Sequence, residues 1–303
     1  MCVDLHTHSV YSDGTDSPAR LISMAAAAGL TGFALTDHDT VEGMPEVLRL
    51  GQEQGIKVIS GLEISAKHGD ISVHILGYGI DPEHPQLNAW LSRIQKGRRE
   101  RNQQIMIKLA ALGMEISLEE VEQFSGCGQT GRPHIARLLT VKGHVKHPSQ
   151  AFTRYLGRNK AAWHPRFACS AAESIAIIHQ AGGAAVLAHP GLIDPTLKKQ
   201  PQLIRELAER DMDGLEAHYP KHSHQMTELF SSLARRHQLL LTGGSDYHGD
   251  SRIKGLAGPA TGFCPPDSIM EQLCQRLSRL QAASVNPDQK PHPDQDHADH
   301  TCC

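Results

Sequence analysis

Short apolar runs alternate with amphipathic segments over the first 80 residues of the chain. The amphipathic segments at 17–30 and 44–55 repeat their apolar residues with the period of a helix. In the first segment Ser17 is placed to cap the helix, Pro18 suits its first turn and Gly29 ends it. The apolar runs predict four strands, at 2–8, 32–39, 57–65 and 72–80. This rhythm predicts a largely parallel sheet with helices outside it.

The rhythm breaks between residues 85 and 165, where helical patterns follow one another without strand signals. Ser117 and Glu120 fit a capping box at the start of the second pattern. We expect a helical insertion over 85–165 that caps the substrate. Its three helices are expected at 87–113, 117–126 and 132–143.

Alternation of strands and helices returns after the insertion. Further strands are expected at 184–191, 214–219 and 239–249, and a last helix near 267–283. We therefore expect one α/β domain built from residues 1–84 and 166–283. The remainder, 284–303, is rich in Pro, Asp and His, has almost no apolar residue and is expected to be disordered.

Composition narrows the class of protein. The chain has 303 residues, a formal net charge of −3 and 20 histidines. No overall basic field indicates nucleic acid or an anionic membrane, so a nucleic-acid substrate would need a local basic patch. The histidine excess favours metal binding.

The cysteines and the N-terminus bear on the compartment. The seven cysteines are odd in number and irregular in spacing, with no Cys-x-x-Cys pair, which favours reduced thiols over a disulfide framework. No apolar run reaches the ~18 residues of a membrane span, and the first residues lack the features of a signal peptide. We expect a cytoplasmic protein without a membrane partner, and no protein partner is evident.

The opening stretch "DLHTHSVYSDGT" places His6 and His8 two residues apart near the end of the first expected strand. Residues two apart on a strand point to the same face, so both imidazoles aim at one place. Alone, a His-x-His pair is a weak signal, because a chance or structural origin explains most such pairs.

The ends of the other expected strands carry similar groups. In a parallel α/β barrel the strand C-termini open onto one face, where their side chains converge. A structural role explains a single buried histidine, but burying this many polar groups without partners is costly. The groups at strand ends are His38, Glu63, His189, Asp246 and His248; His74 lies within the fourth strand and Asp13 in the loop after the first.

Histidine and carboxylate ligands without cysteine suit Mn²⁺, Zn²⁺ or Fe²⁺. The candidate ligands are too many for one ion, so we expect a multinuclear site. Ions in such sites activate water and stabilise the charge that develops on phosphoryl oxygens.

Six stretches occur in the order typical of one family: "DLHTHSVYSDGT", "TDHDT", "GLEIS", "VHILGYG", "LAHPG" and "GGSDYHG". They resemble the PHP (polymerase and histidinol phosphatase) superfamily over residues 2–283. The insertion and "GRPHIAR" resemble the group that removes the 3′-phosphate of nucleoside 3′,5′-bisphosphates and acts as a 5′→3′ exoribonuclease, the RNase AM type. The resemblance implies a distorted seven-stranded α/β barrel with a trinuclear site, usually described with Mn²⁺; Zn²⁺, Fe²⁺ or Mg²⁺ are alternatives.

Carried over residue by residue, the resemblance implies three sets of metal ligands. The first ion would be held by His6, His8, Glu63 and Asp246. The second would be held by Asp13, His38, His189 and His248, to which we also assign the catalytic role. The third would be held by Glu63, His74 and His134.

The segment "KGRRERNQQ" in the insertion suggests how substrate is bound. Arg98 and Arg101 are three apart and share a helix face, and arginine offers phosphate two hydrogen bonds at once. A solvated charged helix explains the segment equally well without the resemblance. With it, the expected contacts to a 5′-phosphate are Arg98, Arg99, Arg101 and Asn102, with His134 also near the substrate. Arg132 either assists or caps a helix.

The substrates implied are nucleoside 3′,5′-bisphosphates and short 5′-phosphorylated RNA. One alternative is a histidinol-phosphate phosphatase or another small-molecule phosphatase, against which the basic insertion argues. A second is a non-catalytic PHP module, which loss of ligands would signal; none of the expected ligands is missing.

Overall fold

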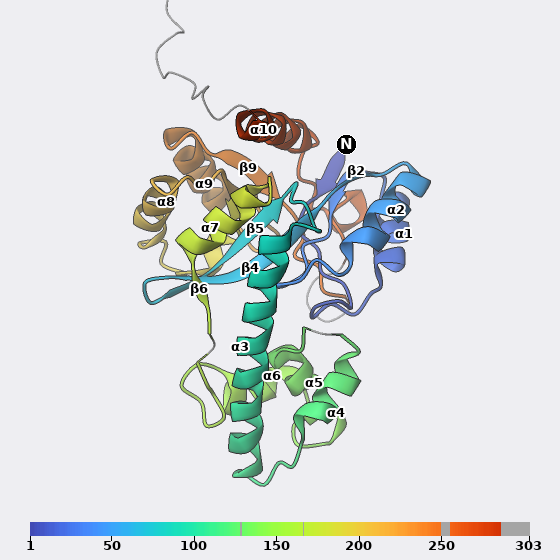
Figure 1. The fold of residues 1–303 in the computed structure, drawn as a ribbon, viewed down its shortest axis with the longest axis vertical. Helices are drawn as coiled ribbons and strands as arrows, with labels where there is room; N and C mark the ends of the chain where they lie inside the picture. Colours follow the sequence, from blue (N-terminus) through green and yellow to red (C-terminus); the bar gives the residue numbers. More distant parts are fainter. Residues whose placement is uncertain (128, 166, 250–254, 286–303) are drawn as a thin grey trace, which may run out of the picture.

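A computed structural model describes residues 1–127, 129–165, 167–249 and 255–285. It shows an α/β body from which a long helix leads into a helical arm (Figure 1). Nearly all of the tail expected to be disordered lies outside the described residues, as does Arg166 at the expected end of the insertion. The strands are β1 (Cys2–Asp4), β2 (Leu30–Ala34), β3 (Lys57–Ile59), β4 (Gly61–His68), β5 (Ile71–Tyr78), β6 (Cys169–Ser170), β7 (Ala184–Leu187), β8 (Gly214–His218) and β9 (Leu240–Gly243).

Helices pack around the sheets and build the arm. The helices of the body are α1 (Pro18–Ala27), α2 (Met44–Gln54), α7 (Ala171–Gln180), α8 (Gln200–Ala208), α9 (His224–Arg236) and α10 (Ser268–Val285). The helices of the arm are α3 (Pro85–Ala110), α4 (Leu118–Ser125), α5 (Arg132–Val141), α6 (Pro148–Ala151) and the π-helix η1 (Phe152–Leu156). Two 3₁₀ turns, η2 (Pro190–Leu192) and η3 (Pro259–Thr261), complete the described elements.

The strands form two sheets, in the orders β1-β2-β3 and β6-β4-β5-β7-β8-β9. Most neighbours run parallel, as expected, but β5 runs antiparallel to both β4 and β7. The reason is local: β4 and β5 are joined by a tight turn at Gly69, whose φ of 56° suits glycine. A hairpin therefore interrupts the βαβ pattern.

Backbone hydrogen bonds link the edges of the two sheets. Beyond β1 and β9, the amide of Leu5 donates to the carbonyl of Gly243 at 3.2 Å and that of His8 to Tyr247 at 2.8 Å. At the other edge, the backbone amide of Glu63 donates to the carbonyl of Asp37 at 3.1 Å. These links give the barrel-like closure that the resemblance implies. Nine strands are described, so the strand count of seven is not confirmed.

Several expected strands differ in extent: β2, β7 and β9 end at Ala34, Leu187 and Gly243, earlier than expected, and two other segments differ further. Segment 57–65 is not one strand, because the chain changes sheets at Ser60 and forms β3 and β4. Glu63 is consequently the third residue of β4 and not the end of a strand. β1 ends at Asp4, before His6 and His8, where pairing with β2 gives way to contacts with the chain after β9.

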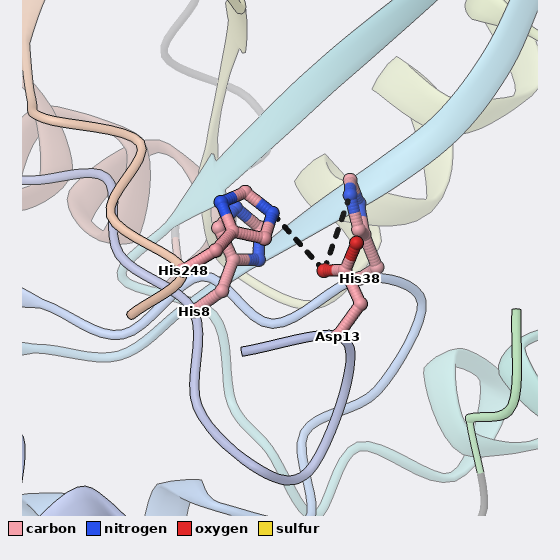
Figure 2. Close-up of side chains that lie close together, drawn as sticks. All are labelled: His8, Asp13, His38 and His248. Carbon is pink, nitrogen blue, oxygen red and sulfur yellow. Dashed lines mark ion pairs between the residues drawn. The ribbon is translucent and has the colours of Figure 1, made fainter. Parts of the chain in front are cut away.

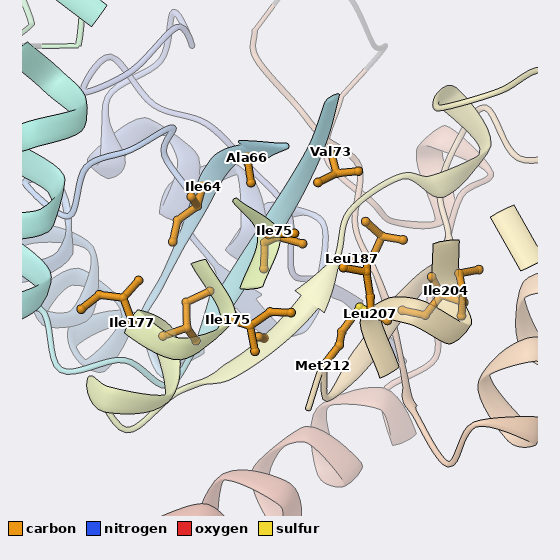
Figure 3. Packing of buried hydrophobic residues seen from close by; sticks show 14 of the residues in the cluster. Ile64, Ala66, Val73, Ile75, Ile175, Ile177, Leu187, Ile204, Leu207 and Met212 are labelled. Atoms are coloured by element: carbon orange, nitrogen blue, oxygen red, sulfur yellow. The ribbon is translucent and has the colours of Figure 1, made fainter. Parts of the chain in front are cut away.

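The main core lies between the larger sheet and helices α7, α8 and α9 (Figure 3). Ile64 and Ile75 on the sheet pack against the face of α7 that carries Ile175. Leu187 lies near Leu207 of α8 in the same cluster. Burial of these side chains stabilises the fold by about 25 cal/mol for each Å² of apolar surface removed from water. It thereby holds in place the strands whose ends carry the histidines.

The arm has a separate apolar cluster, in which Ile105 and Leu109 of α3 pack with Val121 of α4 and with Ile135 and Leu139 of α5. The two expected helix N-caps are confirmed. Ser17 accepts a hydrogen bond from the Arg20 amide, and Ser117 and Glu120 form a capping box. The exact boundaries of the insertion remain a prediction.

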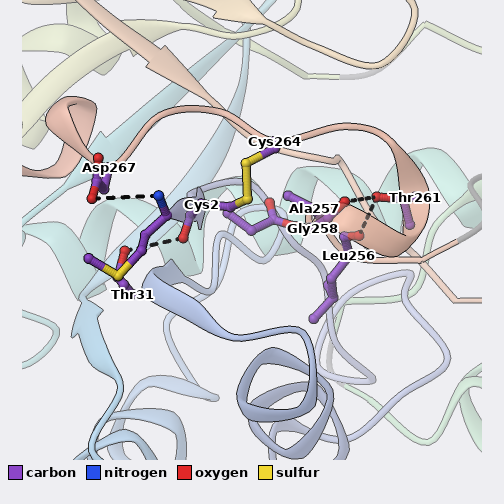
Figure 4. Close-up of a disulfide and its surroundings, with 10 residues drawn as sticks. Cys2, Thr31, Leu256, Ala257, Gly258, Thr261, Cys264 and Asp267 are labelled. Atoms are coloured by element: carbon purple, nitrogen blue, oxygen red, sulfur yellow. Dashed lines mark hydrogen bonds and ion pairs between the residues drawn. A yellow bond between two sulfur atoms is a disulfide. The ribbon is translucent and has the colours of Figure 1, made fainter.

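Cys2 and Cys264 form a disulfide, so the expectation that the cysteines are all reduced thiols is wrong (Figure 4). The two residues are 262 positions apart in sequence, yet their Cα atoms lie 5.0 Å apart. The fold brings the segment after β9 back beside β1, which spacing along the chain does not reveal. The cysteine pattern therefore no longer supports a reducing compartment. Within the described part of the chain, no helix has the length and apolarity needed to cross a membrane.

Candidate metal centre

Histidines and carboxylates from both sheets converge at one end of the barrel. Nε2 of His248 lies 3.0 Å from Oδ1 of Asp13, and Nε2 of His38 lies 3.9 Å from the same oxygen (Figure 2). The ring of His8 stacks on that of His248 with 4.0 Å between centroids. Residues from the first and last strands of the barrel thus share one site, as the strand-end argument predicts.

Glu63 is the hub of the site, with a side chain that is 1% exposed. Its Oε1 lies 2.8 Å from Nδ1 of His74 and 3.0 Å from Nε2 of His189. Its Oε2 lies 2.9 Å from Nδ1 of His38, and also faces His8 and His6 at 3.3 and 3.4 Å. A carboxylate whose two oxygens face different imidazoles can bridge two ions.

Three groups of ligand atoms lie close enough to hold ions, each group within 4.8 Å. One group matches the expected ligands of the first ion. The second contains His8 where His189 is expected, and the third contains His38 where His134 is expected. The groups are His6, His8, Glu63 and Asp246; His8, Asp13, His38 and His248; and His38, Glu63 and His74.

Buried polar atoms without hydrogen bonds show that the site fits metal ions. Among the described residues, these atoms include Nε2 of His6, His8 and His248, and Oε2 of Glu63. Such atoms are costly in a protein interior unless a further partner satisfies them. All of them point into the same cluster, and nitrogen and oxygen donors without thiolate suit the divalent ions expected from the sequence.

The electrostatics of the carboxylates and of His74 agree with this fit, whereas nearby carboxylates outweigh burial and raise the pKa values of the ligand candidates His6, His8, His38 and His189. Burial alone would raise the pKa of Glu63, but the imidazoles of His38 and His74 hold it well below its usual range. The pKa values of Asp13 and Asp246 are lowered in the same way, chiefly by His248. Burial lowers the pKa of His74 to about 4. Ionised carboxylates and a neutral imidazole are the states that metal ions require of their ligands.

Glu216 of β8 contacts two of the expected ligand residues and is not among the residues expected from the sequence. It is fully buried, and its Oε1 lies 2.9 Å from Nδ1 of His6 while its Oε2 accepts a hydrogen bond of 2.7 Å from the His189 amide. A carboxylate on one ring nitrogen leaves the other nitrogen of His6 facing Glu63 and Asp246. The signal was present, since Glu216 lies in the expected strand 214–219.

We expect Glu216→Gln to lower metal affinity and activity by about 10- to 100-fold, the usual cost of losing a carboxylate that orients a ligating histidine. Gln keeps the size of the side chain, so the thermal midpoint should change little. Metal titration and initial rates measure the effect, with Glu228→Gln, whose side chain is 67% exposed on α9, as the control. An unchanged metal affinity would show that Glu216 only supports the fold.

Two other buried residues, Asp37 and Tyr219, hold the loops that carry the ligands. Asp37 accepts hydrogen bonds from the hydroxyls of Ser9 and Ser12, at 2.6 and 2.5 Å, and so shapes the loop before Asp13. The hydroxyl of Tyr219 donates to Oδ2 of Asp246 at 2.9 Å. Asp246 itself has a φ of 54°, a conformation that aspartate tolerates better than most residues. These contacts join distant segments, so no local pattern indicates them.

A basic pocket of about 320 Å³ in the arm is lined by Lys96, Arg98, Arg99 and Asn102, and also by Glu122, which pairs with Arg99 at 3.1 Å. Arg98 forms an ion pair with the buried carboxylate of Asp39, the residue that follows His38. The side-chain amide of Gln95 donates from Nε2 to the backbone carbonyl of Asp39 at 3.2 Å. The basic pocket is therefore tied to the loop that carries His38.

The remaining expected substrate residues are placed differently. Arg101 is 5% exposed and does not line this pocket. His134 is buried and its Nδ1 accepts a hydrogen bond of 3.0 Å from the Gly131 amide; burial and the Arg137 guanidinium lower its pKa to about 4. No potential metal group among the described residues includes His134. Arg132 donates to the carbonyl of Leu156 at 3.2 Å, a contact within the arm.

With this geometry established, comparison with known proteins identifies the family. The PHP domain model matches residues 4–210. The chain belongs to the PHP domain family. This match confirms the expected superfamily and α/β fold. Most of the histidines that converge in the site lie within the matched residues.

Two curated proteins and one solved structure are similar to this chain over most of its length. A 3′,5′-nucleoside bisphosphate phosphatase of Chromobacterium violaceum is 35% identical over 247 residues, 81% of this chain and 87% of that protein. The 5′-3′ exoribonuclease Rnm of Escherichia coli is 32% identical over 249 residues, 81% of this chain and 84% of that protein. A solved structure described as a putative metal-dependent phosphoesterase from Bifidobacterium adolescentis superposes with a TM-score of 0.80 at 31% identity, covering 90% of this chain and 96% of that one.

Proposed function

We propose that this PHP protein is a metal-dependent phosphoric ester hydrolase that removes the 3′-phosphate of nucleoside 3′,5′-bisphosphates. In the same site it would cleave 5′-phosphorylated RNA from its 5′ end. The observation that carries the proposal is the pairing of two anion sites, the metal-ligand cluster and the basic pocket around Arg98, joined through the loop His38–Asp39. A bisphosphate has one phosphate for each.

The ligand cluster opens into a hollow of about 320 Å³ that is lined by His38, His189, Tyr219, Lys221 and Asp246. Metal ions held there would polarise the phosphoryl oxygens and supply an activated water. The chain's own groups would position the ester: Arg98 and Arg99 would hold the 5′-phosphate by charge-assisted hydrogen bonds. Asn102, whose Nδ2 donates to the Thr130 carbonyl at 2.9 Å, would align the rim of the basic pocket.

We propose three ions, with Mn²⁺ as the first candidate. The ligand groups around Glu63 support this number, and the absence of thiolate ligands in them favours Mn²⁺, Zn²⁺ or Fe²⁺. In this assignment His189 and His134 remain candidate ligands: His189 because it already contacts Glu63, and His134 because its low pKa keeps the ring neutral.

A phosphate-release screen tests the proposal. Protein loaded with Mn²⁺ should hydrolyse adenosine 3′,5′-bisphosphate faster than adenosine 3′-phosphate, adenosine 5′-phosphate or histidinol phosphate, and chelator should abolish release. Preference for histidinol phosphate would favour the small-molecule phosphatase. Metal binding without turnover of any substrate would favour a non-catalytic module.

A further inference from the structure

The second half of the arm contains a long stretch without acidic residues. No Asp or Glu lies between Glu122 and Glu173, although eight Lys or Arg do, in a chain whose net charge is −3. One of them, Arg166, lies outside the described residues. A cationic segment of this length is unusual in a slightly acidic protein, and it concentrates positive potential on one part of the molecule.

Three of these cations have partners within the fold. Lys142 pairs with Glu120, Arg132 donates to the Leu156 carbonyl, and Arg137 donates to the carbonyl of Asp13 beside the metal ligands. The other four are exposed, and within the described part of the chain none of them has an acidic partner. We call these four the basic surface: Lys146, Arg154, Arg158 and Lys160.

The basic surface contains a concave part. A hollow of about 540 Å³ is lined by Lys146 and Arg154, together with His144 and the hydroxyl residues Ser149 and Thr153. Cations that line a hollow suit the non-bridging oxygens of phosphodiesters, while the Ser149 and Thr153 hydroxyls are hydrogen-bonded within the arm. Arg154 also lies over the ring of Tyr155, 5.0 Å from its centroid, so an aromatic ring lies beside the cations.

Helix α5 lies between the hollow and the basic pocket. Arg132, at the start of α5, contacts Leu156, two residues after Arg154. A Cβ at Gly131 would lie 3.2 Å from Nη1 of Arg98, so the same end of α5 adjoins the basic pocket. Lys146 lies beyond the other end of α5, a helix of 10 residues or about 15 Å. Cations thus extend from the basic pocket over a length that a mononucleotide does not need.

We propose that the basic surface binds the ribose-phosphate backbone of a single RNA strand beyond its 5′ nucleotide. This rests on the proposed function only for the direction of the strand, since backbone binding requires no catalysis. Basic grooves with neighbouring aromatic rings are typical of single-strand binding. The surface would distinguish RNA from free bisphosphate nucleotides, which share the same 5′ end.

The test compares Lys146→Gln/Arg154→Gln with a control of equal charge change, Arg20→Gln/Arg235→Gln, whose residues are exposed on α1 and α9. The Mn²⁺-loaded proteins are titrated with a fluorescent 12-nucleotide RNA that carries a 5′-hydroxyl, by anisotropy at several salt concentrations. Two lost phosphate contacts should reduce the slope of log Kd against log salt by about 1.4 and weaken binding about 5- to 25-fold near 0.1 M salt. The control should bind like the unchanged protein.

Kinetics provide the second readout. The Lys146→Gln/Arg154→Gln variant should raise KM for a 5′-phosphorylated 12-mer while leaving kcat/KM for adenosine 3′,5′-bisphosphate and for a 5′-phosphorylated dinucleotide unchanged. Equal binding by variant and control would overturn the inference, as would an unchanged protein that binds the 12-mer no better than the dinucleotide. So would charge-dependent binding to vesicles containing phosphatidylserine in the absence of RNA binding. RNA binding that depends on these two cations, without any hydrolysis, would support the surface and refute the proposed function.

Discussion

Asp13→Ala and His248→Ala should each lower hydrolysis of adenosine 3′,5′-bisphosphate by about a thousandfold or more. Asp13 and His248 face each other at 3.0 Å within one candidate ion site. An ion's stabilisation of the reacting phosphoryl group is worth several kcal/mol, and each ~1.4 kcal/mol is a factor of ten. Initial rates in Mn²⁺, together with the metal content per chain, measure the effect.

His224→Ala is the matched control for the histidine, because its side chain is 87% exposed on α9 and pairs only with Glu228 among the described residues. It should change neither metal content nor rate. Retention of full activity by Asp13→Ala, or by the unchanged protein held in chelator, would refute the metal-dependent hydrolase. A variant that loses metal and activity together but keeps its circular dichroism spectrum would support it.

Arg98→Ala should lower kcat/KM for adenosine 3′,5′-bisphosphate by roughly 10- to 150-fold, the equivalent of about 1.5–3 kcal/mol for a hydrogen bond to a charged group. Hydrolysis of p-nitrophenyl phosphate, which has no second phosphate, should hardly change. Arg98→Lys should recover only part of the loss, since an ammonium does not reproduce the two parallel hydrogen bonds of a guanidinium. Arg93→Ala on the same helix is the control, because Arg93 contacts Cys169 and does not line the basic pocket.

Loss of the Arg98–Asp39 ion pair would also destabilise the fold, and this effect must be separated from loss of phosphate binding. Asp39 is fully buried, so removing the guanidinium should lower the free energy of unfolding by about 3–5 kcal/mol. The double variant Arg98→Ala/Asp39→Asn removes both charges and should regain stability without regaining hydrolysis of the bisphosphate. Two results would show that Arg98 holds the loop of His38 and does not bind phosphate. One is a double variant that regains activity together with stability; the other is an equal loss of kcat/KM for adenosine 3′,5′-bisphosphate and p-nitrophenyl phosphate in Arg98→Ala.

Local patterns predicted most of the secondary structure because caps and periodicity act over a few residues. Ser17 caps α1 and the Ser117–Glu120 box starts α4, as expected. The predictions were wrong where strand pairing joins segments far apart in sequence. Segment 57–65 has the composition expected of a single strand, but Ser60 lies where the chain passes from one sheet to the other. The hairpin between β4 and β5 is different, because its tight turn at Gly69 is local, and the expected βαβ order did not allow for it.

The same division holds for the site. The sequence by itself determined the chemistry, because imidazole and carboxylate at successive strand ends already specify a metal-binding rim, and the family motifs lie within local stretches. Only the tertiary structure decided how these groups combine. It made Glu63 the hub, placed His8 rather than His189 beside Asp13, and set Glu216 behind His6. It also joined Cys2 to Cys264 and tied Arg98 to Asp39. The physical reason is that each of these contacts joins segments far apart along the chain, whose distance is set by core packing and sheet order and not by local sequence.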